Sequence, residues 1–226
     1  FKAENKNVSL IEPEQFLQTN DASLNAVADL NTCKSRFQNV YAQLEPIALM
    51  PGFIGVSEAG QVTTLGRNGS DYSAAVLAVC AKAERCEIWT DVDGVYNADP
   101  RMIKDAKLLD YLSYQEAMEL SYFGASVLHP KTIGPIAQFH IPCLIKNTGN
   151  PSVPGTLIAN ENDQKKQVKA ISNLDNLTMI NVSGPGMKGM VGMASRVFAT
   201  MSRESISIVL ISQSSSEYCI SFCIHS

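Results

Sequence analysis

The chain has no excess of positive charge, few aromatic residues and no long apolar run. It carries 18 Lys and Arg against 22 Asp and Glu, a net charge of -4, and 7% of its residues are aromatic. This balance provides no basic field for nucleic acid. The longest apolar run, Ala74 to Ala81, is too short to span a bilayer, and no charged-then-apolar signal segment opens the chain. We therefore expect a cytoplasmic protein without nucleic-acid or membrane partners.

The chain also lacks the cysteine patterns of a metal site or a disulfide framework. No CxxC pair and no partnering histidine spacing accompanies its six cysteines, which are Cys33, Cys80, Cys86, Cys143, Cys219 and Cys223. Isolated cysteines of this kind are typical of buried free thiols. We therefore predict neither a metal site nor a disulfide.

Strands and helices are predicted to alternate through residues 1–159. Apolar runs predict strands at 8–11, 47–56, 87–90, 143–146 and 157–158. The strand at 47–56 is expected to be buried and to run into a break at Pro51-Gly52, and a turn at 58–61 predicts a hairpin with 62–65. Helices are predicted near 32–44, over 71–83, from the capping box Ser113–Glu116 to Tyr122, and after Pro130. The 71–83 helix is apolar nearly all round and is therefore expected inside the protein. This order predicts a three-layer α/β domain with a largely parallel sheet.

A polar and charged stretch at 160–169 is predicted to be a linker to a second domain, 170–226. That domain is predicted to hold strands at 177–182, 206–212 and 218–224 and a helix at 188–202. This β-α-β-β order is incomplete as a domain.

Two further expectations concern the second domain. Its helix places Met190, Ala194, Val197 and Met201 at helical spacing, so we expect these side chains in the core. An open sheet edge near Ile224 is expected to pair with another copy of the chain, giving a homo-oligomer.

Residues Gly184–Gly189 spell G-x-G-x-x-G between a predicted strand and a predicted helix. A nicotinamide site is not favoured, because no acidic residue ends the following strand at 205–211 and a second strand follows at once. The segment is then either a tight turn or a small-molecule site, where free amides at a helix N-terminus suit a carboxylate.

The segment Gly66-Arg67-Asn68-Gly69-Ser70-Asp71 combines flexible backbone with the expected start of a helix. Free amides there favour anionic groups, and Arg67 has the geometry to grip a carboxylate with two hydrogen bonds. Taken alone, Ser70 and Asp71 are better explained as helix N-cap residues, but the neighbouring loop at Asp91 reverses this preference.

The stretch from Ile88 to Arg101 runs from an apolar strand into a turn rich in hydroxyls and carboxylates. Such a loop suits a nucleotide and its metal ion. A calcium loop at Asp91–Gly94 is excluded, because the glycine comes too early and the terminal bidentate glutamate is missing. Taken singly, Asp93-Gly94 and Asp99-Pro100-Arg101 are also explained as turns.

Taken together, these segments, with Phe123–Pro130 and Asn147–Pro151, resemble the aspartokinase branch of the amino-acid kinase family. The resemblance implies an amino-acid-kinase domain at 1–159 that transfers the γ-phosphate of ATP, with Mg²⁺, to the side-chain carboxylate of L-aspartate. It implies that aspartate is held by Arg67, Ser70 and Asp71, and that ATP is contacted by Thr90, Asp91, Tyr96 and Arg101. Relatives place a nucleotide-binding lysine where this chain has Ser126, and Lys131 is the candidate to replace it.

The second domain resembles the start of an ACT regulatory region. Ser183–Met187 and Gln213–Glu217 resemble the threonine-sensitive type that is fused to a homoserine dehydrogenase. The resemblance implies feedback regulation by an amino acid, expected to be L-threonine, with Gln213 as the effector contact. The homoserine dehydrogenase part is expected to lie outside this chain.

Several family features are missing from this chain. The Lys-Phe-Gly-Gly strand that cradles the transferred phosphate has no match, and the early threonine and glutamate are missing too. No catalytic set is complete, so we expect a fragment, the C-terminal part of the kinase domain, without turnover of its own. Two alternatives stay open: another amino-acid kinase, acting on glutamate, or a non-catalytic amino-acid-binding and dimerisation module.

Overall fold

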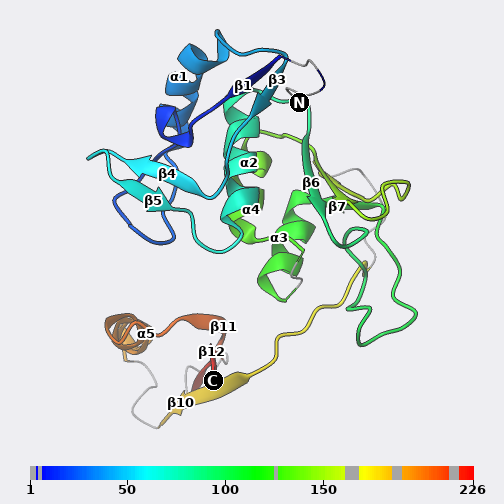
Figure 1. The fold of residues 1–226 in the computed structure, drawn as a ribbon. Coiled ribbons are helices and arrows are strands. Elements are labelled where there is room, and N and C mark those ends of the chain that lie inside the picture. Colours follow the sequence, from blue (N-terminus) through cyan, green and yellow to red (C-terminus); the bar gives the residue numbers. More distant parts are fainter. Residues whose placement is uncertain (1–3, 5–6, 125–126, 161–167, 185–189, 214–218) are drawn as a thin grey trace. The chain divides into compact units, whose positions relative to one another are not determined.

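The computed structural model describes residues 4, 7–124, 127–160, 168–184, 190–213 and 219–226. The chain divides into two compact units, Phe1–Ser172 (unit 1) and Asn173–Ser226 (unit 2), as Figure 1 shows. Each unit is described by itself.

Unit 1 alternates strands and helices along the chain, as the sequence predicts. Its strands are β1 (Val8–Leu10), β2 (Gln18–Thr19), β3 (Ile47–Leu49), β4 (Ile54–Ser57), β5 (Val62–Thr64), β6 (Cys86–Thr90), β7 (Tyr111–Ser113), β8 (Cys143–Asn147) and β9 (Thr156–Ala159). Its helices are the 3-10 turn η2 (Pro13–Gln15), α1 (Leu30–Tyr41), α2 (Gly69–Cys80), α3 (Tyr114–Tyr122) and α4 (Pro130–Gln138).

The strands of unit 1 pair mainly in parallel. The largest sheet has the order β6-β8-β9-β7, in which β6 with β8 and β7 with β9 are parallel and β8 with β9 is antiparallel. Smaller sheets are β2-β4-β5 and the parallel pair β1-β3. The predicted hairpin is confirmed as β4 and β5. The α/β fold and its largely parallel pairing therefore agree with the prediction.

Helix α2 lies between two hydrophobic clusters, which explains its apolar composition. Ala75 and Val79 pack in the cluster that contains β6 and β8, whereas Tyr72 and Val76 pack in the cluster that contains Phe37 of α1. A helix buried on two sides needs apolar residues around most of its circumference. The prediction that this helix lies inside the protein is confirmed.

The segment 47–56, predicted as a buried strand that runs into a Pro-Gly break, is interrupted at that break. It is divided into β3 and β4, and β3 is partly exposed rather than buried. Between them Phe53 has a φ of +79°, and its N–H donates to Ser73 Oγ at 3.3 Å. The chain leaves the extended conformation there because it turns toward the first turn of α2.

Local signals placed other elements correctly. The capping box is present at α3, where Ser113 Oγ accepts from Glu116 N–H and the Glu116 carboxylate accepts from Ser113 N–H.

Strand β7, which directly precedes α3, was not predicted. Three residues give too little pattern for a sequence signal, and β7 forms only by pairing with β9.

Unit 2 contains β10 (Leu177–Ser183), α5 (Met193–Arg203), β11 (Ile208–Gln213) and β12 (Cys219–His225). The sheet order is β10-β12-β11, with both pairs antiparallel. Ile224 therefore lies in the central strand, so the predicted open edge near it is wrong and the edges are β10 and β11. The ladder of β12 with β10 involves all seven residues of each strand.

Helix α5 begins at Met193, later than the predicted start at Lys188, which lies outside the described residues. Ala194, Val197 and Met201 pack against the buried side chains of β12, as predicted. Met190 precedes the helix and is 52% exposed, so its predicted core position is wrong.

All six cysteines are free thiols. Cys219 is partly buried and the other five are buried. Within the residues that the structure describes, no helix combines the length and the apolar character needed to cross a bilayer.

Candidate functional site

The Gly66–Asp71 loop leads directly into α2. The N-cap of this helix is Asn68, in the left-handed conformation at φ +55° and without a side-chain cap bond. Ser70 and Asp71 lie inside the first turn, so they do not occupy the N-cap position that was the alternative explanation for them. The amides of this turn point to the helix N-terminus, where anions are favoured.

The connection between β3 and β4 packs against this first turn and fixes it. A Cβ on Gly69 would lie 2.7 Å from the Phe53 ring, so only glycine fits between that ring and Leu65. Ser73 Oγ donates to Ser70 O at 2.7 Å and accepts from Phe53 N–H. The helix start is therefore held from outside the helix, independently of a capping side chain.

The charged groups of this loop are of both signs. Burial raises the pKa of Asp71, although contacts with Asn68 and Ser70 oppose the shift. The Arg67 side chain is exposed, and no hydrogen bond or ion pair among the described residues involves it. Burial, followed by the positive charges of Arg67 and Lys131, lowers the pKa of His129, the N-cap of α4. The loop thus presents an unpaired guanidinium and a partly buried carboxyl group, and the charge of Arg67 acts on the imidazole of His129.

The second candidate segment, Thr90–Arg101, begins at the carboxyl end of β6. Thr90 pairs in register with Asn147 at the end of the parallel strand β8, and Thr148 N–H donates to Thr90 O at 2.8 Å. The Asn147 amide donates to Asp93 Oδ1 at 2.7 Å, and Tyr96 OH donates to Asp93 Oδ2 at 3.4 Å. Asp91 Oδ1 accepts from Thr90 Oγ1 at 3.1 Å. Two carboxylates are thereby oriented at the ends of two adjacent parallel strands.

The middle of this loop is anchored to the sheet. Gly94 has a φ of +146°, and a Cβ there would lie 2.5 Å from Thr156 Oγ1. The same hydroxyl accepts from Val95 N–H at 2.9 Å and donates to Leu109 O at 2.7 Å. Asp93-Gly94 is therefore a turn that β9 holds in place.

Arg101 is paired with Asp99 near the end of the loop. Its Nη2 and Nε donate to the Asp99 carboxylate at 2.8 and 3.1 Å, and these hydrogen bonds lower the pKa of Asp99. The Arg101 side chain is 83% exposed. The ion pair between Asp99 and Arg101 therefore agrees with the interpretation of Asp99-Pro100-Arg101 as a turn. The Arg101 guanidinium nevertheless remains exposed to solvent.

Lys131 lies in the first turn of α4. Its Nζ donates to backbone carbonyls of Ala26 at 2.7 Å and Leu65 at 2.8 Å, and to Asn25 Oδ1 at 3.0 Å. None of the interactions found for Lys131 within the described residues reaches the Thr90–Arg101 loop. This position argues against the expected replacement of a nucleotide-binding lysine, because the ammonium group is occupied beside the Gly66–Asp71 loop instead.

The two candidate loops lie at the same end of unit 1. Helix α2 and strand β6 are consecutive and pack together, and a connection of only five residues (81–85) makes them run in opposite directions. The start of α2 therefore lies at the end where β6 finishes, as Figure 1 shows. In α/β folds, ligands bind beyond the carboxyl ends of parallel strands. The arrangement suits a small anionic substrate at one loop and a nucleotide at the other.

Sequence analysis missed Asp93, Asn147 and His129 as individual residues of the site. A signal existed for Asn147, because a polar side chain follows the apolar strand β8, which neighbours β6. The proximity of His129 to Arg67 depends on the packing of α4 against α2 and has no local signal.

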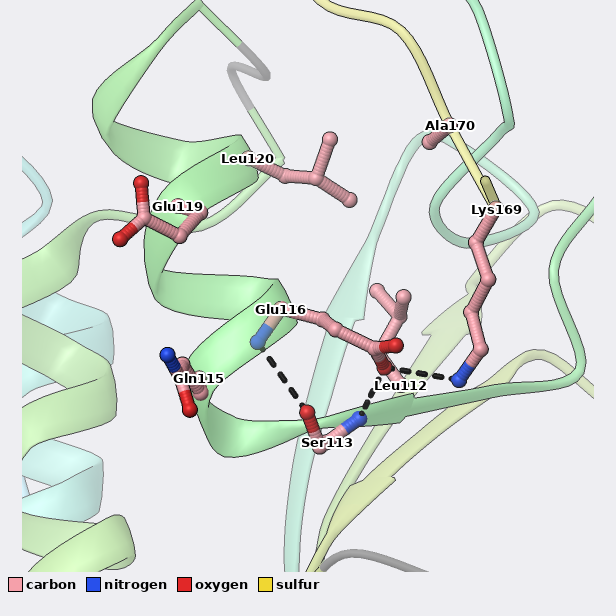
Figure 2. Close-up of a pocket in the computed structure, with 8 residues that line it drawn as sticks. All are labelled: Leu112, Ser113, Gln115, Glu116, Glu119, Leu120, Lys169 and Ala170. Carbon is pink, nitrogen blue, oxygen red and sulfur yellow. Dashed lines mark hydrogen bonds and ion pairs between the residues drawn. The ribbon is translucent and has the colours of Figure 1, made fainter. Parts of the chain in front are cut away.

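A further contact joins the Thr90–Arg101 loop to the segment that precedes unit 2. Lys169 Nζ donates to the Glu116 carboxylate at 2.8 Å beside an open hollow of about 380 Å³, shown in Figure 2. Two residues later, Ile171 N–H donates to Asn97 O at 2.9 Å. The segment 168–171 is thereby attached both to α3 and to the candidate nucleotide loop.

Gln213 is the last residue of β11, pairs with Ile220 and is exposed. Several expectations fall outside the described residues: Ser126, most of the Gly184–Gly189 motif, residues 214–217 and the linker residues 161–167. In the described part of the chain, no group of three or more His, Cys, Asp or Glu side chains is arranged for a metal ion.

Comparison with known families gives two matches. The profile of the amino acid kinase family matches residues 6–147, and the profile of an ACT domain matches residues 180–226. The first match covers both candidate loops, and the second covers most of unit 2.

Curated relatives match nearly the whole chain. The chain is 55% identical over 225 residues to a bifunctional aspartokinase/homoserine dehydrogenase of Haemophilus influenzae, and 51% identical over 227 residues to one of Buchnera aphidicola. These matches cover 99% and 100% of this chain and 28% of each relative. The chain therefore spans less than a third of the length of either.

Solved structures support the same relation. The crystal structure of E. coli aspartokinase III with aspartate and ADP, an R-state, superposes with a TM-score of 0.84 at 32% identity. The T-state of the same enzyme, with lysine and aspartate, gives a TM-score of 0.77 at 31% identity. The matches cover 100% and 99% of this chain and half of that enzyme in each case.

Proposed function

Because the chain belongs to the amino acid kinase family, we propose that it forms part of an aspartate kinase. The reaction transfers the γ-phosphate of ATP to the side-chain carboxylate of L-aspartate. The observation that carries this proposal is the placement of an unpaired arginine at a helix N-terminus beside a strand-end loop with two oriented carboxylates. The aspartokinase relatives, one of them solved with aspartate and ADP, support the choice of substrate.

The Gly66–Asp71 loop is assigned to aspartate. The Arg67 guanidinium is free to form a bidentate pair with a substrate carboxylate, and the first-turn amides of α2 add further donors. Asp71 is suited to accept the substrate ammonium group, whose positive charge would favour the ionised carboxylate despite its burial. Ser70 is exposed in the same turn and completes the subsite.

The Thr90–Arg101 loop is assigned to ATP, with Thr90, Asp91, Tyr96 and Arg101 as its contacts. Phosphoryl transfer depends mainly on positioning and on neutralising charge. The donor set fits Mg²⁺, which is usually bound by one or two carboxylates together with substrate phosphates. Asp91 and Asp93 supply such carboxylates. MgATP supplies the phosphoryl group when bound, and the exposed face of Arg101 is available to its phosphates.

Unit 2 is assigned to feedback regulation by an amino acid. The ACT match and the solved lysine-bound T-state of a relative support an amino-acid effector. We assign L-threonine as this effector and Gln213 as a contact, on the resemblance to the bifunctional type. Regulation of this kind requires that the effector bind two arrangements of the enzyme with different affinity. Assembly into a homo-oligomer is part of the same proposal.

The test of the kinase assignment is Arg67→Lys in the intact polypeptide that carries this sequence. Lysine keeps the charge but loses the bidentate geometry. We expect the KM for aspartate to rise about 10- to 100-fold, with the KM for MgATP nearly unchanged, measured by trapping aspartyl phosphate with hydroxylamine. Arg36→Lys, on the exposed surface of α1, is the matched control. An unchanged KM for aspartate in the Arg67 variant would remove this loop from the substrate site.

The 226-residue chain by itself is expected to show no turnover, since it contains no Lys-Phe-Gly-Gly segment to stabilise the transferred phosphate. Detectable aspartyl phosphate from this chain alone would refute the expectation. It would leave the assignment of the two loops intact.

A further inference from the structure

Lys131 occupies a position that the local sequence disfavours. It is the second residue of α4, where the helix dipole repels a positive charge, and burial lowers the pKa of its ammonium group. A lysine placed in this way needs compensating partners from elsewhere in the fold.

Those partners come from two segments distant in sequence. The three shortest hydrogen bonds of Lys131 Nζ, to Ala26 O, Leu65 O and Asn25 Oδ1, match the three N–H groups of an ammonium ion. Asn25 O lies a little farther away, at 3.3 Å. The ammonium group is therefore saturated by oxygen atoms, and it joins the 25–26 segment to Leu65, the first residue of the connection between β5 and α2.

The oxygen atoms that Lys131 holds lie against the Gly66–Asp71 loop. Leu65 directly precedes Gly66, which has a φ of +79°. A Cβ on Gly66 would lie 2.6 Å from Asn25 Oδ1, so the loop and Asn25 are in close contact. Asn25 itself has a φ of +59°. Asn25 and Gly66, both in the left-handed backbone conformation, are thus in contact where Lys131 Nζ donates its hydrogen bonds.

Lys131 also contacts the far side of the same loop. Its Nζ lies 4.9 Å from the centre of the Tyr72 ring, and Tyr72 directly follows Asp71. The Tyr72 hydroxyl accepts from Ala28 N–H at 3.0 Å, which ties α2 to the segment after Ala26. Lys131 therefore touches the residue before the loop and the residue after it. Among the described residues, the hydrogen bonds of Lys131 Nζ involve none of the residues between them that are assigned to aspartate, which are Arg67, Ser70 and Asp71.

We propose that Lys131 is a positioning residue for the aspartate subsite, acting through Arg67 and Asp71 by fixing both ends of the Gly66–Asp71 loop. This positioning role replaces the expected role of Lys131 as a nucleotide contact. The proposal rests on the proposed kinase function. Small misplacements of substrate-holding groups lower rates strongly, because transfer requires a near-attack arrangement of the reacting atoms.

The test compares Lys131→Met, Lys131→Arg and the control Lys82→Met in the intact polypeptide. Methionine keeps the length and removes the donors, arginine keeps both charge and donors, and Lys82 is exposed at the other end of α2. For Lys131→Met we expect kcat/KM for aspartate to fall 10- to 100-fold, while the KM for MgATP changes less than about 2-fold. Lys131→Arg is expected to recover most of the loss, and Lys82→Met to match the wild type.

Other outcomes decide against the proposal. A rise in the KM for MgATP would return Lys131 to the nucleotide site, and unchanged kinetics would show that the ammonium group positions nothing. If Lys131→Met does not fold, Asn25→Gly decides, since it keeps the left-handed backbone and removes one oxygen atom. A smaller loss in the aspartate parameters is expected for it, and no loss would overturn the proposal. Absence of aspartate phosphorylation in the wild type would instead refute the proposed function.

Discussion

At the scale of single residues, Gly155 controls the hairpin between β8 and β9. Its φ is +85°, and a Cβ there would overlap the Ile145 carbonyl oxygen. The hairpin is also held by Lys146, whose Nζ donates to Pro151 O and Val153 O at 2.9 and 2.7 Å. Because β8 ends at Asn147, which orients Asp93, this packing reaches the candidate nucleotide loop.

Gly155→Ala is therefore expected to destabilise unit 1 severely. Gly60→Ala is the matched control, since Gly60 has a φ of +79° and no atom within 4 Å of the added Cβ. The control should lose about 1–2 kcal/mol of unfolding free energy from the left-handed backbone alone. The Gly155 variant should lose at least about 2 kcal/mol more, because the overlap with Ile145 adds to that strain. Urea unfolding measures both losses, and equal values would show that the hairpin relaxes freely.

At the scale of elements, the sequence predicted those whose signals are local. The capping box of α3 and the apolar α2 are set by residues within one or two turns of each other. The break between β3 and β4 has a local signal, Pro51-Gly52. The contact that follows it, from Phe53 N–H to Ser73 Oγ, has none because it joins residues twenty positions apart. The start of α5 was predicted too early because the spacing of Met190 mimics a helix. Periodicity alone does not reveal where backbone hydrogen bonding begins.

The same distinction holds for the candidate site. The candidate residues Arg67, Ser70, Thr90 and Asp91 come from short motifs, so the sequence alone is enough to propose them. The position of Lys131 at the carbonyls of Ala26 and Leu65 joins segments 66 to 105 residues apart, so no motif predicts it.

The ion pair between Lys169 and Glu116 of α3 predicts a pH-dependent contribution to stability. Burial raises the pKa of Glu116, but hydrogen bonds from Lys169 and Ser113 and the charge of Lys169 outweigh it, so the pKa is lowered overall. A lowered pKa stabilises the folded state fully above the unfolded value, about 4.3, and this contribution is lost as pH falls through the folded value. Because the pair is partly exposed to solvent, we expect only about 0.5–1 kcal/mol.

Glu116→Gln should therefore lower the unfolding free energy at pH 7 and approach the wild type as the pH falls toward 3. Urea unfolding across this range measures the difference. Glu119→Gln, on the exposed side of the same helix, is the control. A difference that is independent of pH would mean that packing, not charge, links Lys169 to α3.

At the scale of the whole molecule, the two units are assigned different ligands. A thermal-shift titration shows which of these ligands stabilises the folded chain. Selective binding to the folded state raises its stability by about 2.7 kcal/mol at 100 times the dissociation constant. We expect L-threonine to stabilise this chain more than lysine or methionine does, and Gln213→Ala to remove the effect. Gln43→Ala, exposed after α1, is the control. Stabilisation by lysine instead would reassign the effector.

The attachment of Ile171 to Asn97 couples the last residues of unit 1 to the segment assigned to ATP. Ile171 lies one residue before Ser172, where unit 1 ends, and its N–H is bonded to Asn97 O. A change that shifts the Thr90–Arg101 loop must therefore either carry the end of unit 1 with it or break this hydrogen bond.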